Sequence, residues 1–315
     1  MVHRPQRQQH PGLLQNCSNI SVFERPALSI RWSATTPRHC RRLNTIAEAK
    51  AQRAVVILPG LGNNSNDYKA VGEALESRGL HVQCAAVTRP DWLRNAAGLR
   101  QIEYWTGTLE PRPTVDWYLN KVDDAVKAAK QATDGPITVL AHSAGGWLSR
   151  VYLLGYGTEQ IDRLVTLGSP HQAPPKDLKL VDQTRGILTW VTDNVPGNFH
   201  KEVGYATVAG KWLKGAKLRG SGGSLAQKLV GLGYQQVCGD AEVWGDGITP
   251  VPAAHLAGAE QLTLEGVYHS PLGGGTDRPW YGSPEIIDQW IRVVYEKELD
   301  TKYQVEVGDM VAPQN

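Results

Sequence analysis

From residue 53 onward, short apolar runs alternate along the chain with segments whose apolar residues recur at helical spacing. This alternation is typical of α/β folds, in which helices join parallel strands. Most of the runs are almost continuously apolar, as expected for strands that are covered on both faces. We therefore predict a mostly parallel sheet with helices on both faces. The predicted strands are AVVILPG, LHVQCAAV, PITVLAHS, DRLVTLGSP, YQQVCGD and AEQLTLEGVYH.

Helical periodicity predicts three helices, over about 66–78, over 115–132 and from Ser283 onward. In the second of these, the residues of one stripe are all apolar and should face the sheet. They are Val115, Leu119, Val122, Val126 and Ala129.

Two long segments interrupt the alternation. Residues 88–114 are rich in aromatic side chains, and residues 172–232 contain a glycine and serine run at 220–224. Loops of this length are uncommon in compact domains unless they have a function, so both are candidate walls or lids of a site. We predict that 172–232 is a cap insertion; the alternative is a tightly packed surface insertion. The predicted cap carries an apolar helical stripe that could meet a lipid surface: Ile187, Leu188, Val191 and Val195.

Charge separates the first fifty residues from the rest. The whole chain has 33 Lys and Arg against 31 Asp and Glu, a balance that argues against a nucleic acid partner. Residues 1–50 hold eight basic and two acidic residues, which predicts a disordered organelle transit peptide; the alternative is a retained basic arm. We expect the folded domain at 51–299 and a polar tail at 300–315. No apolar run reaches 18 residues, so we expect at most peripheral membrane contact.

The segment ITVLAHSAGGWLSR at 137–150 combines a buried strand, a serine and a helix. Such a sharp strand-to-helix turn projects the serine hydroxyl above the sheet, beside the positive end of the helix. The turn requires small residues two positions before and after the serine, and Ala141 and Gly145 meet that requirement. Ser143 is therefore the candidate nucleophile. The alternative is a serine in an ordinary strand-to-helix turn.

A nucleophilic serine requires a base and a carboxylate that orients the base. After elbows of this kind, the acid comes next in the chain and the histidine last. Asp246 lies in GDGITP and His269 follows the last predicted strand, so we predict a Ser143, His269 and Asp246 triad. Asp240 is the competing acid. We prefer Asp246, because glycines on both sides of it let its loop turn back toward the imidazole. Three other histidines are expected to be packing or pocket residues: His142, His171 and His255.

An oxyanion intermediate requires two backbone N–H donors. Ala144, which follows the serine, should supply one, and Leu61 in the LPGLG turn should supply the other. The alternative for this turn is a phosphate-binding glycine loop, although GxGxxG and GxxxxGK[ST] are both missing. Sequence motifs for a metal site, such as HExxH or paired CxxC, are also missing, so we expect no metal and no cofactor.

The motifs LPGLGNNSNDY, AHSAGG, LGSPH and GDGITP together resemble an α/β-hydrolase of the serine lipase and esterase group. In particular, they are similar to plant, algal and cyanobacterial lipase-like hydrolases related to the GPI inositol deacylase type. Ala141 departs from the usual first glycine of the elbow, a variation also seen in some bacterial lipases of the family. The resemblance favours the chloroplast over the mitochondrion as destination of the leader.

The motifs and the resemblance together predict a serine hydrolase that cleaves a carboxylic ester of a lipid or another apolar acyl compound through an acyl-enzyme. An acyltransferase or thioesterase would use the same triad, and a non-catalytic binding protein would share the fold. The expected partner is a small-molecule ester or lipid. The sequence does not indicate an oligomeric state. The candidate substrate pocket residues are Trp92, Trp105, His171 and Trp190.

Overall fold

The computed structural model describes residues 52–175, 182–219, 222–272 and 277–295. The chain divides into two units, Met1–Ala47 and Glu48–Asn315, and all the described residues belong to the second. The predicted transit peptide at 1–50 and the predicted tail at 300–315 lie outside the described residues.

Six strands form one sheet in the order β2-β1-β3-β4-β5-β8, and every neighbouring pair is parallel. The predicted parallel sheet is thus confirmed. All side chains of β1 and β3 are buried, which explains why β1 is apolar throughout and β3 is apolar except for Thr138 and His142. The strands are β1 (Ala54–Leu58), β2 (His81–Cys84), β3 (Ile137–His142), β4 (Ile161–Leu167), β5 (Gly204–Lys211) and β8 (Glu260–Glu265).

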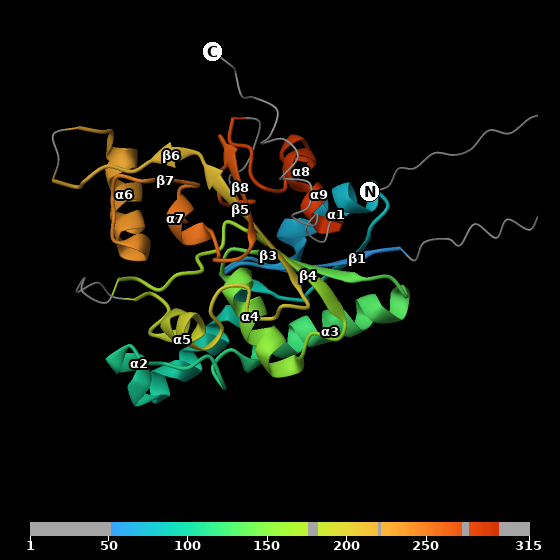
Figure 1. Cartoon of the computed structure of the whole chain (residues 1–315). Coiled ribbons are helices and arrows are strands. Elements are labelled where there is room, and N and C mark those ends of the chain that lie inside the picture. The colour runs from blue at the N-terminus through green and yellow to red at the C-terminus, as the bar shows by residue number, and fades with distance from the viewer. Residues whose placement is uncertain (1–51, 176–181, 220–221, 273–276, 296–315) are drawn as a thin grey trace, which may run out of the picture. The chain divides into compact units, whose positions relative to one another are not determined.

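Helices cover both faces of this sheet, as predicted (Figure 1). Alternate residues of a strand point to opposite faces. Accordingly, Val56 packs with the helices drawn below the sheet, and Val55 packs with those drawn above it. The lower helices are α3 (Asp116–Ala132), α4 (Ala144–Tyr156) and α5 (Ile187–Asn194), and the upper ones are α1 (Lys69–Glu76), α8 (Pro284–Trp290) and α9 (Arg292–Tyr295).

The predicted helical stripe of residues 115–132 is confirmed, because all five of its apolar side chains are buried. The aromatic segment 88–114 contains two helices. They are the 3₁₀ helix η2 (Arg89–Arg100) and the short α-helix α2 (Ile102–Thr106). Another 3₁₀ turn, η1 (Ser65–Tyr68), precedes α1.

The predicted strand YQQVCGD is wrong, because these residues end a helix, α6 (Leu225–Cys238). Ser224 and Gln227 form a capping box at its start, and Gly239 ends it in the left-handed conformation. Gly231 and Tyr234, three residues apart, are buried on one side of the helix. A short helix end with few apolar residues is easily mistaken for a strand.

The predicted single insertion at 172–232 is also wrong, because it contains β5, a strand inside the main sheet between β4 and β8. The sequence of β5, GYATVAGK, consists mostly of small residues, so its apolar signal is weak although six of its eight residues are buried. Two separate insertions replace the single predicted cap: one lies between β4 and β5, and the other between β5 and β8. The second carries α6, α7 (Val251–Ala254) and a two-stranded antiparallel sheet of β6 (Leu213–Lys214) and β7 (Trp244–Gly245).

The apolar stripe of the predicted cap faces inward. Ile187, Leu188, Val191 and Val195 are 0 to 6 % exposed, and the first three belong to the lower core with α3 and α4. In this structure the stripe therefore packs against the sheet domain and offers no face to a lipid surface, which is the packed arrangement considered as the alternative.

Candidate active site

Ser143 lies in a strained turn between β3 and α4. Its backbone has φ 52° and ψ −125°, a conformation that is rare for any residue other than glycine. The turn is crowded, because a Cβ added at Gly145 would lie 2.8 Å from the Leu58 carbonyl oxygen, and one added at Gly146 would meet Ser169. The crowding at Gly145 thus comes from β1 and not from Ala141. The geometry is that of a nucleophile elbow.

The structure brings Ser143, His269 and Asp246 together in one hydrogen-bonded chain. His269 Nε2 lies 3.0 Å from Ser143 Oγ, and His269 Nδ1 lies 2.7 Å from Asp246 Oδ2. A carboxylate only accepts hydrogen bonds, so the proton of the neutral ring is on Nδ1 and Nε2 is free to accept from the serine. Asp246 is fully buried, and His269 is 6 % exposed.

Asp246 is held by three further hydrogen bonds. The hydroxyl of Tyr281 donates to Oδ2 at 2.7 Å, and the amides of Ile248 and Thr249 donate to Oδ1 at 3.0 and 2.7 Å. Gly247, with φ 102°, turns the loop back after the acid. Both carboxylate oxygens therefore have fixed partners, which sets the side of the carboxylate that faces His269.

The competing acid, Asp240, lies elsewhere. It is exposed, it follows α6, and its Oδ1 accepts a hydrogen bond from the Glu242 amide at 2.8 Å. Asp246 directly follows the short strand β7 and not a strand of the main sheet. Tyr281, by contrast, was not predicted as a site residue, because its contact with Asp246 spans 35 residues and has no local sequence signal.

A buried histidine links the turn after β1 to the backbone of His269. His142 Nε2 lies 2.8 Å from the His269 carbonyl oxygen, and its Nδ1 lies 2.7 Å from the Tyr68 hydroxyl. The carbonyl can only accept, so His142 Nε2 carries the proton and Tyr68 donates to Nδ1. Tyr68 in turn accepts from the amide of Gly60 and from the Asn63 side chain, both at 2.9 Å. His142 is thus a packing residue with a defined tautomer.

This network predicts a dependence of stability on pH. Burial, together with the neighbouring His269, lowers the pKa of His142 to about 3. The unfolded chain takes up this proton near pH 6.5, so the free energy of unfolding should fall as the pH drops from about 6.5 towards 3. The variant His142→Gln keeps a side-chain donor but does not titrate. Measured by urea unfolding, its free energy of unfolding should fall less between about pH 7 and pH 4 than that of the wild type. An equally steep loss in the variant would contradict this role of His142.

The two predicted oxyanion donors flank Ser143. Ala144 is the first residue of α4, where amides have no partner within the helix. Gly60, next to Leu61, packs against the nucleophile, because a Cβ added there would lie 2.8 Å from Ser143 Cβ. The Gly60 amide already donates to Tyr68. The next amide in this turn that could donate to an oxyanion is therefore that of Leu61. The arrangement is compatible with both assignments.

The four predicted pocket residues do not form one group. Trp92 lies under the turn after β1, where its Nε1 donates to the Asn63 carbonyl at 2.8 Å. Trp105 is 67 % exposed on α2, and Trp190 packs half-buried against the lower core. Of the two roles predicted for His171, the structure shows packing and not a pocket wall, because this side chain is 1 % exposed and its Nε2 lies 2.9 Å from Thr166 Oγ1. His171 lies four residues after the end of β4, and its side chain is buried.

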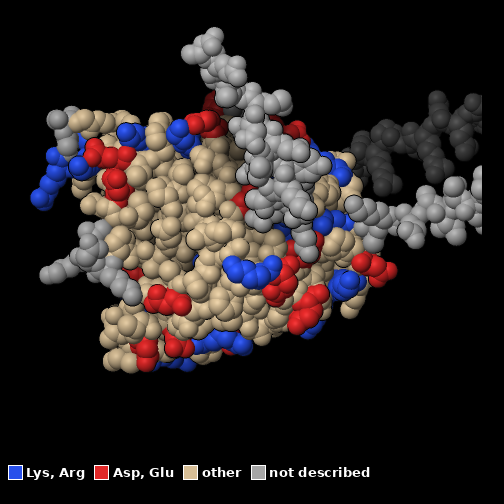
Figure 2. All heavy atoms as spheres, in the orientation of Figure 1, with Lys and Arg blue, Asp and Glu red and all other residues tan. Residues whose placement is uncertain are grey.

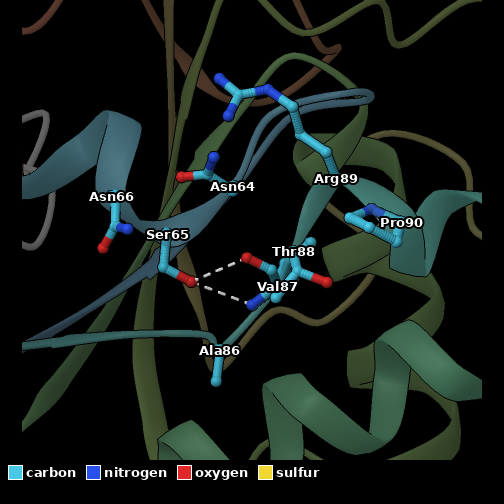
Figure 3. Close-up of a pocket in the computed structure, with 8 residues that line it drawn as sticks. All are labelled: Asn64, Ser65, Asn66, Ala86, Val87, Thr88, Arg89 and Pro90. Atoms are coloured by element: carbon cyan, nitrogen blue, oxygen red, sulfur yellow. Dashed lines mark hydrogen bonds between the residues drawn. The ribbon is translucent and has the colours of Figure 1, made fainter.

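A cavity of about 350 Å³ opens where the chain leaves β1 and β2 (Figure 3). Residues 64–66 and 86–90 line it, and Ser65 joins its two sides through hydrogen bonds with Val87. Arg89 at its rim is paired with Asp67 at 2.8 Å. None of the triad or predicted pocket residues lines this cavity, although its residues 88–90 begin the aromatic segment predicted as a candidate wall.

Within the described ranges, no group of three or more His, Cys, Asp or Glu side chains is arranged to hold a metal ion. None of the helices in that part of the chain is long and apolar enough to cross a membrane.

A comparison with protein-family models agrees with this architecture. The family model for the α/β hydrolase fold matches residues 53–201, and the chain has that fold. A search of curated proteins finds no match.

Similar solved structures include a Bacillus licheniformis lipase, BlEst2 (15 % identity, TM-score 0.42, covering 78 % of this chain and 90 % of the other). They also include a metagenomic carboxyl esterase, MGS0156 (12 % identity, TM-score 0.49, 78 % and 76 % covered). A third is the phospholipase PlaB from Legionella pneumophila (13 % identity, TM-score 0.45, 81 % and 62 % covered).

Proposed function

We propose that the protein is a serine hydrolase that cleaves carboxylic esters. The observation that carries this proposal is the continuous hydrogen-bonded chain from Ser143 Oγ through His269 to the buried Asp246, at a strained elbow. Strained backbone conformations cluster at active sites, and here the strained serine has a base and an orienting acid beside it, which supports a catalytic role.

The geometry supports the following steps. Ser143 Oγ attacks the acyl carbonyl while His269 Nε2 takes its proton, and the amides of Leu61 and Ala144 stabilise the oxyanion. The ester C–O bond breaks as His269 returns the proton to the leaving alcohol. Water then attacks the acyl-enzyme with His269 again as base, which releases the acid and restores Ser143. Asp246 holds the ring and stabilises its positive charge.

We propose an apolar acyl group, as in a lipid, as the substrate class. Exposed apolar side chains near the triad support this choice, including Leu61 in the turn after β1, Ile248 beside Asp246, and Leu272 three residues after His269. Acyl transfer and thioester hydrolysis would use the same residues, so they are alternative outcomes of the test below.

A fluorophosphonate probe tests the proposal, because it reacts with an activated serine. We expect one adduct, and peptide mass spectrometry should place it on Ser143. Turnover of p-nitrophenyl esters of increasing chain length and of matching thioesters, with and without an added alcohol, would then identify the leaving group and the acyl acceptor. A pure, folded sample without an adduct and without turnover would contradict the proposal.

We further propose, from its Arg-rich and acid-poor composition, that residues 1–50 target the protein to an organelle, the chloroplast before the mitochondrion. A fluorescent fusion of this segment should enter the organelle, and full-length protein that stays in the cytosol would contradict the proposal.

A further inference from the structure

Helix α6 exposes three leucines on one side. Leu225, Leu229 and Leu232 are 72, 58 and 39 % exposed, and their spacing of four and three residues places them on one helix face. Leu218, in the loop before the helix, is 52 % exposed. Single exposed leucines are ordinary, whereas a stripe along a helix indicates a surface that is covered in use.

Basic residues accompany these leucines. Residues 212–239 contain four Lys and Arg and no Asp or Glu, and Lys214, Lys217 and Arg219 are exposed ahead of the helix. Lys217 pairs with Glu242 at 2.7 Å, and Figure 2 shows blue and red side chains together at the end of the molecule that carries β6 and α6 in Figure 1. An apolar stripe beside cationic side chains is typical of a segment that binds a lipid surface with an apolar interior and anionic headgroups.

The opposite face of α6 contacts the loop of the proposed catalytic acid. Tyr234 is fully buried, its hydroxyl accepts a hydrogen bond from the Gly247 amide at 2.8 Å, and it donates to the Leu213 carbonyl at 3.2 Å. Gly247 directly follows Asp246, and Ile248, the next residue, is 56 % exposed. The buried face of α6 is therefore attached, through Tyr234, to the loop that carries the proposed catalytic acid.

We propose that α6 docks the protein on the surface of an anionic lipid membrane. The leucines would enter the boundary between headgroups and acyl chains, while Lys214, Lys217 and Arg219 contact anionic headgroups. A second copy of the chain fits less well, because a twofold contact through α6 would bring the cationic residues of both copies together. The proposal rests on the proposed function for its consequence, which is that the ester is taken from a lipid surface.

Vesicle sedimentation of the full-length protein tests the docking directly. We expect binding to vesicles of phosphatidylcholine mixed with phosphatidylglycerol, weaker binding to pure phosphatidylcholine, and loss of the difference at high salt. The double variant Leu225→Ser and Leu229→Ser should bind at least about tenfold more weakly. Leu154→Ser, which changes a leucine 40 % exposed near the end of α4, is the matched control and should bind like the wild type.

A second variant keeps the test decisive if the leucine variant misfolds. Lys214→Glu with Arg219→Glu should remove the preference for anionic vesicles, and turnover of a short soluble ester should stay at the wild-type rate in all these variants. An active wild type that ignores anionic vesicles would overturn the docking and leave the esterase proposal intact. Vesicle binding without labelling or turnover would overturn the esterase proposal and leave the docking intact. A dimer in light scattering that the leucine variant dissociates would show that α6 binds a second copy, which also overturns the docking.

Discussion

Replacing Ser143 with alanine should reduce turnover of a soluble ester by about 10⁶-fold, because the other triad members have no nucleophile to activate. Labelling by the fluorophosphonate should disappear as well. Alanine has no Oγ but fits the space of serine at the elbow, so the free energy of unfolding should change little. The measurement is kcat for a p-nitrophenyl ester together with urea unfolding of the same sample.

Ser149→Ala is the matched control for this variant. Ser149 lies in α4, is 1 % exposed, and its hydroxyl donates to the Gly146 carbonyl at 2.6 Å. We expect wild-type labelling and nearly wild-type kcat from it. Retained turnover in pure Ser143→Ala protein, or loss of labelling in Ser149→Ala alone, would show that Ser143 is not the nucleophile.

Asp246→Asn should lower kcat by about 10⁴-fold while the protein stays folded. The amides of Ile248 and Thr249 hold one carboxylate oxygen, so the oxygen of asparagine should take that place and its NH₂ should face His269. The NH₂ would donate to His269 Nδ1, which moves the ring proton to Nε2. In that tautomer His269 cannot accept the proton of Ser143.

Asp240→Asn is the control, because Asp240 is exposed and its Oδ1 accepts from the nearby Glu242 amide. We expect its kcat to stay close to that of the wild type. If Asp240→Asn were the more damaging of the two substitutions, Asp246 would not be the acid that orients His269.

Local sequence was sufficient where local interactions determine the structure. Strands β1 and β3 are predictable because both are buried on both faces and are therefore largely apolar. Ser143 was identified because a tight strand-to-helix turn needs small residues within a few positions of the serine. Strand β5 was missed for the opposite reason, since its small residues are buried by their position between β4 and β8 and not by their own hydrophobicity.

The sequence by itself therefore determined the parallel sheet, the helices on both faces and the three triad candidates, because each depends on periodicity or on a short motif. Only the tertiary structure decided the remaining contacts. It brought Asp246 and not Asp240 to His269, it placed Tyr281 on Asp246, and it joined Tyr68 to His269 through His142. These hydrogen bonds join residues that are 23 to 127 positions apart, so no local sequence pattern predicts them. They form only when the segments after several strands meet at one edge of the folded sheet.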